Sequence, residues 1–330
     1  AVEAAVDLAH TAFIVASKSG SSLEPNILMA FFYQRQTETV GAAKAPGHFI
    51  AITDPGTSLD QRASADGFMR VFHGEPDIGG RFSALSAFGM VPAAICGVDC
   101  RQFLETTQDM VNSCQAMQEL ANNPGVLLGC ILGVAANAGR DKLTIVAAPA
   151  LASIGAWLEQ LVAESTGKQG KGIIPVDGES LATPAAYGND RLFVYLGLAG
   201  EPDPDQERAL TALEQAGQAV VRIRLDGPYG LGAEFFRWEL GTAVAGAVMG
   251  LNPFDQPDVE ASKVEARKIT EAYEKGGRLP EAVPLATDGE LTLFADERNA
   301  TELQALAGEQ TVAALLKVHF KRARAGDYIA

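Results

Sequence analysis

The sequence predicts an α/β fold in which two parallel-sheet units are joined by helices. Short apolar strands alternate with helical segments in both halves of the chain, which is the pattern of parallel strands with crossover helices. A stretch without predicted strands, residues 80–139, separates the two alternating regions. After the turn-rich residues 275–284 a further α/β element begins. The expected domains are therefore residues 1–139, 140–278 and 279–330.

The first unit opens with a helical segment at residues 1–10. Apolar runs bounded by glycine, proline and polar residues predict its strands at residues 12–16, 48–55 and 67–73. A polar turn leads from the first strand into a helix that begins at about Leu23.

The second unit follows the same pattern. Its strands are expected at residues 142–148, 191–198 and 219–225, and its helices at residues 151–164, 205–216 and 234–251. The further element carries a predicted strand at 290–295 and a helix at 311–322. Residue 1 lies inside a predicted helix and the final GDYIA reads as the start of a hydrophobic strand, so we expect the chain to be cut at both ends.

Composition excludes several classes of protein. With 330 residues, 47% apolar and 20% charged, the chain has the balance of a globular protein of about two domains. Its net charge of −15 argues against nucleic-acid binding, which needs a basic face. No run reaches the ~18 apolar residues of a membrane span, so we expect no membrane association. The first ten residues lack the basic region of a signal peptide.

Cysteine and histidine usage argues against disulfides and metals. Four cysteines are too few for a disulfide scaffold, and their spacing matches no zinc pattern. We expect buried or half-buried thiols in a reducing compartment, hence a cytoplasmic protein. The four histidines form no cluster, and we expect neither a metal nor a cofactor.

The segment SKSGSSLEP, residues 17–25, is a candidate phosphate site. An apolar strand ends in serines, a lysine and a glycine, and a helix follows. The free N–H groups and the positive dipole end of that helix favour a phosphate. A serine-rich N-cap with a flexible turn explains the same residues equally well. Because the dinucleotide and Walker patterns are absent, a simple phosphate ester is favoured over a nucleotide.

The segment LEQLVAESTGKQGKG, residues 158–172, offers a candidate base. Gln160 and Glu164 stand four residues apart and therefore share a helix face. Glu164 occupies the last turn, where the helix dipole disfavours a carboxylate, just before a Gly/Lys loop. This indicates a general base, although a solvated acidic residue at a helix end explains the position too.

Two further segments carry cations or amides in unusual places. In PDIGGRFS, Arg81 follows Gly80 in the first turn of a predicted helix, where a cation is unfavoured unless an anion faces it. A surface salt bridge to a neighbouring acidic residue is the alternative. In NPFDQPDVEASK, Gln256 and Lys263 are seven residues apart, about two helical turns, so both can reach one cleft. A capped helix with a solvated lysine is the alternative.

Taken together, these four segments resemble phosphoglucose isomerase. SKSGSSLEP resembles the family's S-K-[ST]-x-[ST]-[ST]-x-E loop, and GGRFSALSAFGM resembles its GGR-[YF]-S helix. QLVAESTGKQGKG resembles Q-x-x-x-E-S-x-G-K, and NPFDQPDVEASK resembles FDQ-x-G-V-E-x-x-K. The motifs occur in the family's order. The variant most similar to this chain is the isomerase half of bifunctional transaldolase/phosphoglucose isomerase.

The resemblance implies two sugar-isomerase (SIS-type, flavodoxin-like) α/β sandwich units with the active site between them. It implies a glucose-6-phosphate/fructose-6-phosphate isomerase of glycolysis and gluconeogenesis that works through a cis-enediol. Glu164 would move the proton between C1 and C2, and Arg81 would stabilise the enediolate oxygen. Gln256 and Lys263 would contact the sugar, with Lys263 placed for ring opening, and Gln160 would line the site.

The resemblance also implies a phosphate site and partners. Glu24 and Gly80 would support the site, and a sugar phosphate would be the substrate. A homodimer and a transaldolase domain in the same parent chain are expected. The predicted phosphate ligands are Ser17, Lys18, Ser19 and Ser22.

The chain departs from the family pattern at three points. The Gly-Gly-Ser-rich turn that should precede residue 1 is missing, and Asp258 stands where the family usually has glycine or asparagine. The usual G-Q-H-[SA]-F segment, whose histidine assists ring opening, is absent after Glu164, and in the fusion variant it is expected past residue 330. The sequence therefore does not identify the residue that assists ring opening. Two alternatives to the isomerase also stay open: a non-catalytic or regulatory sugar-phosphate-binding module, and an isomerase of relaxed specificity that accepts mannose 6-phosphate.

Overall fold

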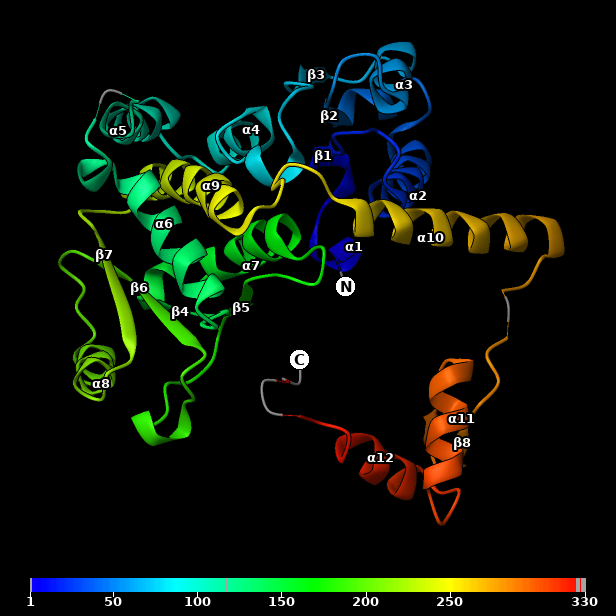
Figure 1. Ribbon diagram of the computed structural model, residues 1–330. Coiled ribbons are helices and arrows are strands. Elements are labelled where there is room, and N and C mark those ends of the chain that lie inside the picture. The colour runs from blue at the N-terminus through cyan, green and yellow to red at the C-terminus, as the bar shows by residue number, and fades with distance from the viewer. Residues whose placement is uncertain (1, 117, 280, 325–326, 328–330) are drawn as a thin grey trace. The chain divides into compact units, whose positions relative to one another are not determined.

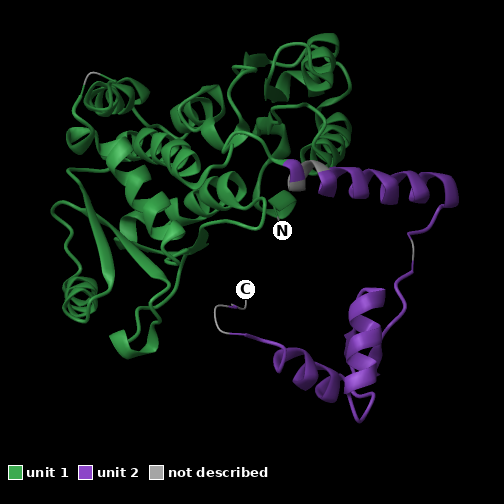
Figure 2. Cartoon of the chain, in the orientation of Figure 1, with its two compact units in different colours: residues 1–256 green, residues 257–330 purple. Residues whose placement is uncertain are grey.

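The computed structural model describes residues 2–116, 118–279, 281–324 and 327 of the chain (Figure 1). The chain divides into two compact units, Ala1–Gln256 and Pro257–Ala330 (Figure 2). Both predicted sheets belong to the first unit, so the expected boundary between residues 139 and 140 lies inside it. The division into three domains stays a prediction.

The first sheet is parallel, with strand order β1-β2-β3. The central strand β2 is buried along its whole length, as expected for a parallel strand covered on both faces. Its strands and crossover helices are β1 (Phe13–Ala16), α2 (Leu23–Val40), β2 (Phe49–Thr53), α3 (Ser58–Asp66) and β3 (Arg70–His73). The predicted strands of this unit are thus confirmed.

The start of the chain differs from the prediction. In place of one helix over residues 1–10, the described residues form α1 (Val2–Ala5) and a 3-10 helix (Leu8–His10). The break has a local cause, because the Asp7 carboxylate accepts the N–H of Ala9 and so begins a new helix.

The second sheet is also parallel, with strand order β5-β4-β6-β7. Its elements are β4 (Lys142–Ala147), α7 (Ile154–Thr166), β5 (Ile174–Val176), β6 (Arg191–Leu198), α8 (Pro204–Gln215), β7 (Ala219–Leu225) and α9 (Gly230–Met249). The three predicted strands are confirmed, and so is the fold class. Strand β5 was missed because it is a three-residue edge strand that contains Pro175.

The described residues between the two sheets contain no strand, as predicted. They form α4 (Ala87–Ile95), α5 (Cys100–Ser113) and α6 (Pro124–Asn137). Short 3-10 helices lie at Ala45–His48, Gly80–Phe82, Leu120–Asn122, Pro149–Leu151 and Pro184–Ala186. Helix α6 packs closely along α9, and a Cβ at Gly129 would lie 2.5 Å from the Gly241 carbonyl oxygen, so only glycine allows this approach.

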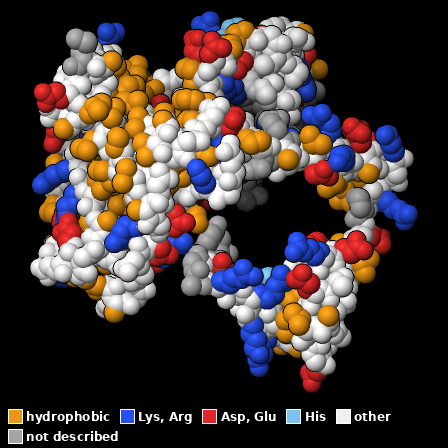
Figure 3. All heavy atoms as spheres, viewed as in Figure 1, with side chains coloured by type: hydrophobic (Ala, Val, Ile, Leu, Met, Phe, Trp, Pro, Cys, Tyr) orange, Lys and Arg blue, Asp and Glu red, His pale blue; other side chains and the backbone are white. Residues whose placement is uncertain are grey.

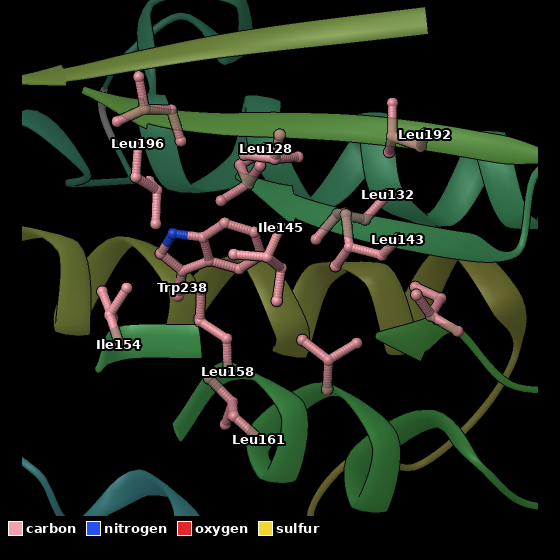
Figure 4. Packing of buried hydrophobic residues seen from close by; sticks show 14 of the residues in the cluster. Leu128, Leu132, Leu143, Ile145, Ile154, Leu158, Leu161, Leu192, Leu196 and Trp238 are labelled. Atoms are coloured by element: carbon pink, nitrogen blue, oxygen red, sulfur yellow. The ribbon is translucent and has the colours of Figure 1, made fainter. Parts of the chain in front are cut away.

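The main core of the first unit lies between the second sheet and helices α6, α7 and α9. Trp238 of α9 is fully buried at its centre (Figure 4). Leucine and isoleucine side chains from α6, α7, β4 and β6 form one cluster with it: Leu128, Leu132, Leu143, Ile145, Leu158, Leu161, Leu192 and Leu196. A smaller cluster against α8 covers the other face of the sheet: Val146, Phe193, Tyr195, Leu210 and Leu213.

The second unit begins with the long helix α10 (Pro257–Gly276). The predicted strand at 290–295 is part of an antiparallel hairpin, and α11 was not predicted. The remaining elements are β8 (Ala286–Asp288), β9 (Leu291–Leu293), α11 (Glu297–Leu306) and α12 (Val312–Phe320). The strand predicted at residues 326–330 lies outside the described residues, apart from Asp327.

Helix α6 contains no charged residue, and apolar side chains gather over it on the face of the first unit seen in Figure 3. Leu127 and Val134 are 46% and 59% exposed there. Within the described residues no helix combines the length and apolar character that crossing a membrane requires.

All four cysteines are free, and Cys96 is exposed, contrary to the expectation, because it lies just past the end of α4.

Candidate active site

Arg81 is the centre of a polar cluster in the first unit. Its side chain is only 4% exposed, and its Nε lies 3.3 Å from Glu164 Oε2. Its Nη1 donates to Ser165 Oγ at 2.7 Å and to the Pro253 carbonyl at 3.4 Å, and its Nη2 donates to Gln256 Oε1 at 3.2 Å. Arg81 is therefore a buried cation whose carboxylate partner, Glu164, lies far away in the sequence. It does not form a surface salt bridge with its acidic sequence neighbours.

The charge of Arg81 is set by burial and by two carboxylates. Burial lowers the pKa of its guanidinium, while Glu164 and Asp255 oppose that shift. An arginine stays protonated under these conditions. Arg81 therefore keeps a fixed positive charge, and its burial strengthens its electrostatic interactions.

Glu164 lies in the last turn of α7, as predicted. Its side chain is 30% exposed, so solvent or a ligand can reach the carboxylate. Gln160, one turn earlier, donates from Nε2 to Glu164 Oε1 at 3.2 Å. One carboxylate oxygen thus faces Gln160 and the other faces Arg81, so both ends of the group are oriented.

Residues 17–22, which we call the serine loop, connect β1 to α2. Gly20 has a φ of 66°, and a Cβ there would lie 2.8 Å from Thr57 Cβ, so the turn requires glycine. The buried Ser17 donates from Oγ to Ser22 Oγ at 3.3 Å. Ser22 is the N-cap residue of α2, yet its side chain makes no cap hydrogen bond. A serine N-cap therefore does not account for the loop.

The ammonium of Lys18 is fully engaged within the protein. Its Nζ lies 2.8 and 2.6 Å from the two carboxylate oxygens of Asp54 and 2.7 Å from the Glu75 carbonyl oxygen. An ammonium has three donors, so these contacts saturate it. Lys18 thus ties the serine loop to the end of β2 and to the segment after β3.

The backbone of the same loop has donors to spare. The N–H groups of Lys18, Ser19 and Ser22 donate to no other described residue. They lie beside the N-terminus of α2, whose first N–H groups also lack intrahelical partners. Such a group of unused N–H donors beside a helix N-terminus is suited to an anion.

Two predicted supporting residues make few contacts. Glu24 is exposed in the first turn of α2 and has no ion pair or hydrogen bond to a described residue. Gly80 starts the 3-10 helix of Arg81, and its carbonyl accepts from Ser83 Oγ at 2.6 Å. Lys263 is exposed on α10 in the second unit, and its sugar contact stays a prediction.

Sequence reasoning missed three residues of this site: Asp54, Ser165 and Lys168. Lys168 is buried, and its Nζ contacts Asp255 Oδ1 at 2.6 Å. Ser165 and Lys168 belong to the segment 158–172 that the sequence analysis singled out. Nothing in the neighbouring sequence indicates which residues they contact. Asp54 follows a buried strand directly, which is a weak signal for a site at the carboxyl edge of a parallel sheet.

Comparison with known proteins points to one family. The family model described as phosphoglucose isomerase matches residues 2–187. Glucose-6-phosphate isomerase from Leptospira interrogans is 27% identical over 287 residues, and that from Lacticaseibacillus casei is 29% identical. Each alignment covers 76% of this chain and 64% of the relative, so the chain spans less than two thirds of the length of these curated relatives.

Solved structures agree on the fold. A hypothetical protein from Thermus thermophilus superposes with a TM-score of 0.71 and 25% identity, covering 80% of this chain and 72% of its own. A glucose-6-phosphate isomerase from Chlamydia trachomatis superposes with a TM-score of 0.69 and 20% identity, covering 83% of this chain and 62% of its own.

Proposed function

The chain belongs to the phosphoglucose isomerase family, and we propose that it forms the catalytic core of a glucose-6-phosphate/fructose-6-phosphate isomerase. The observation that carries the proposal is the pair formed by the buried Arg81 and the reachable Glu164. A base beside a fixed positive charge is the arrangement needed to move a proton next to a carbonyl.

In this proposal Glu164 is the general base. It takes the proton from C2 of the open-chain aldose while O1 gains a proton, which gives the cis-enediol. It then delivers a proton to C1 while O2 loses one, which leaves the ketose. Gln160 orients the carboxylate through its hydrogen bond to Oε1.

Arg81 stabilises the negative charge that develops on the enediolate oxygen. Its guanidinium is already held by Ser165, Pro253 and Gln256, so it needs little reorganisation when the charge appears. Gln256 also contacts the sugar in this scheme. The role of Lys263 in ring opening is a separate part of the proposal, since it belongs to the second unit.

The serine loop binds the substrate phosphate. The unused backbone N–H groups of Lys18, Ser19 and Ser22 support this role, and the serine hydroxyls add donors. The saturated ammonium of Lys18 acts differently: we infer that it shapes the loop and contributes only its backbone N–H to the phosphate.

The test is a coupled assay of fructose 6-phosphate conversion with the full protein that carries this chain, wild type beside Glu164→Gln. We expect the variant to lose a factor on the order of 10² or more in kcat, because it keeps the shape but cannot accept a proton. Undiminished turnover in the variant would refute the assignment of the base. Sugar-phosphate binding without turnover in the wild type would favour the non-catalytic module instead.

A homodimer, a transaldolase domain in the parent chain and a cytoplasmic location remain further proposals. The apolar, partly exposed face of α6 supports self-association. A transaldolase assay on the parent protein tests for the transaldolase domain, and cell fractionation tests the cytoplasmic location.

A further inference from the structure

Lys168 is a buried cation outside the set of residues assigned to the reaction. Its side chain is 3% exposed. Its Nζ lies 2.8 Å from the Asn252 carbonyl oxygen, 2.6 Å from the Asp255 carbonyl oxygen and 2.6 Å from Asp255 Oδ1. All three donors of the ammonium are therefore directed at one four-residue turn, residues 252–255.

The backbone of Lys168 is held in a tight turn that directly follows the helix of Glu164. Helix α7 ends at Thr166, and a tight turn follows in which Lys168 and Lys171 exchange two backbone hydrogen bonds of 3.0 Å. Gln169 and Gly170 both have positive φ, 57° and 73°, as a type I′ turn requires. Lys168 is thus anchored four residues after Glu164.

The turn that Lys168 holds leads directly to Gln256. Arg81 donates to the Pro253 carbonyl in this turn and to Gln256 just after it. The ring of Phe254 lies 5.2 Å from that of Phe82, the neighbour of Arg81. The position of this turn therefore sets where Gln256 meets the guanidinium.

Lys168 also binds a carboxylate whose charge acts on Arg81. Asp255 is 54% exposed, and it opposes the lowering of the pKa of Arg81 that burial causes. Lys168 Nζ contacts Asp255 Oδ1 at 2.6 Å and Asn252 Nδ2 donates to Asp255 Oδ2 at 3.3 Å, so these two contacts hold the carboxylate within the turn. Without Lys168 one of the two contacts is lost, and the carboxylate is freer to move relative to the guanidinium.

We propose that Lys168 is a positioning residue that locks the 252–255 turn against the end of α7, so that Gln256 is aimed at Arg81 and the Asp255 carboxylate keeps its place in the turn. This inference deepens the proposed isomerase function and rests on it. Lys168 acts through other residues and does not touch the reacting atoms.

Lys171 provides a matched control. It belongs to the same tight turn and also donates from Nζ to a backbone carbonyl, that of Met249, at 2.8 Å. Met249 is the last residue of α9 and lies outside the 252–255 turn. A general effect on stability would appear in both lysine variants, whereas a positioning effect belongs to Lys168 alone.

The kinetic experiment compares Lys168→Gln and Lys171→Gln in the full protein. We expect Lys168→Gln to lower kcat/KM for fructose 6-phosphate about 10-fold or more, since small displacements in an active site are costly. Lys171→Gln should stay within about twofold of wild type. Lys168→Arg should recover part of the loss, because a guanidinium can donate to the same oxygens. Equal kinetics in both glutamine variants would overturn the proposal.

A double-mutant cycle separates positioning from simple destabilisation. If Lys168 acts through Gln256, then Lys168→Gln should cost much less in a Gln256→Ala background than in wild type. Full additivity of the two losses would overturn the proposal. If Lys168→Gln does not fold, Asp255→Asn takes its place in the cycle, since it removes the negative charge that Lys168 binds and leaves both carbonyl contacts of the ammonium in place.

Hydrogen exchange makes the test independent of activity. We expect Lys168→Gln to speed amide exchange in the peptide that covers residues 250–257, while Lys171→Gln leaves the exchange of residues 252–256 unchanged. If wild type shows no isomerase turnover, the proposed function fails and the positioning role is judged by this exchange alone. Unchanged exchange in Lys168→Gln would overturn it.

Discussion

At the scale of single residues, the partner of a charge decides what the charge can do. Lys18 and Arg81 both stand in motifs that suggest anion binding, yet their surroundings differ. Asp54 and a backbone carbonyl saturate Lys18. The contacts of Arg81 include Glu164, which a substrate can also reach. Arg81 is therefore suited to catalysis, and the side chain of Lys18 is suited to holding segments together.

This contrast predicts the effect of Lys18→Met. The change leaves Asp54, only 15% exposed, without its cation, so the free energy of unfolding should fall by about 1–3 kcal/mol. Urea unfolding followed by circular dichroism measures it. Ser19→Ala is the control for stability: Ser19 is exposed and should change the free energy of unfolding by less than about 0.5 kcal/mol. A fully stable Lys18→Met with a large rise in KM would instead assign the ammonium to the phosphate.

At the scale of elements, helix α9 concentrates buried ionisable groups. Burial raises the pKa of Glu234 to about 7, against the opposing effect of Arg237, and it raises the pKa of Glu239 to about 8. Glu234 is 2% exposed, and its Oε1 lies 3.2 Å from Arg237 Nη2. Glu234 Oε2 and Glu239 Oε1 have no hydrogen-bond partner among the described residues. Such groups favour the protonated form in the folded protein.

The sign of the resulting pH dependence follows from proton binding. Between pH 4.5 and about 8 the folded state holds protons on these carboxyls that the unfolded state releases. Their stabilising contribution is therefore complete below pH 4.5 and is lost as the pH rises through 7 and 8. For Glu234 the loss amounts to roughly 3 kcal/mol.

Glu234→Gln together with Glu239→Gln should flatten this dependence. An amide cannot ionise, so the double variant should be more stable than wild type at pH 8.5 and closer to it at pH 5. Thermal or urea unfolding across that range tests the expectation. An unchanged slope of stability against pH in the double variant would show that these carboxyls do not cause it.

At the scale of the whole molecule, the first unit presents an uncharged helix face to solvent. Leu127 and Val134 project from α6 while its glycines pack on α9. If this face joins two copies, Val134→Lys should convert the dimer to a monomer, because a dimer would bury the added charge. Sedimentation velocity at micromolar concentration measures the change, and Ala216→Lys, an exposed site at the end of α8, serves as the control. A dimer that persists in Val134→Lys would place the interface elsewhere, and a monomeric wild type would end the homodimer proposal.

The elements that local patterns define were predicted well. Apolar runs gave the strands of both sheets, and the position of Glu164 in the last turn of α7 followed from helical spacing. Elements with weak local patterns were missed, such as β5 with its proline, and β8, the partner of the predicted strand in the hairpin. The helix predicted over residues 1–10 failed for a local reason, the capping by Asp7.

The sequence by itself determined the two parallel sheets, the serine loop before α2 and the order of the motifs, because these depend on neighbours within a few residues. Tertiary structure alone decided which partners the charged side chains meet. Ser165 and Gln256 reach Arg81 across 84 and 175 residues of chain, and Lys18 meets Asp54 across 36. Whether a lysine binds a ligand or a carboxylate depends on which group packing places within about 3 Å of it, and no local pattern contains that distance.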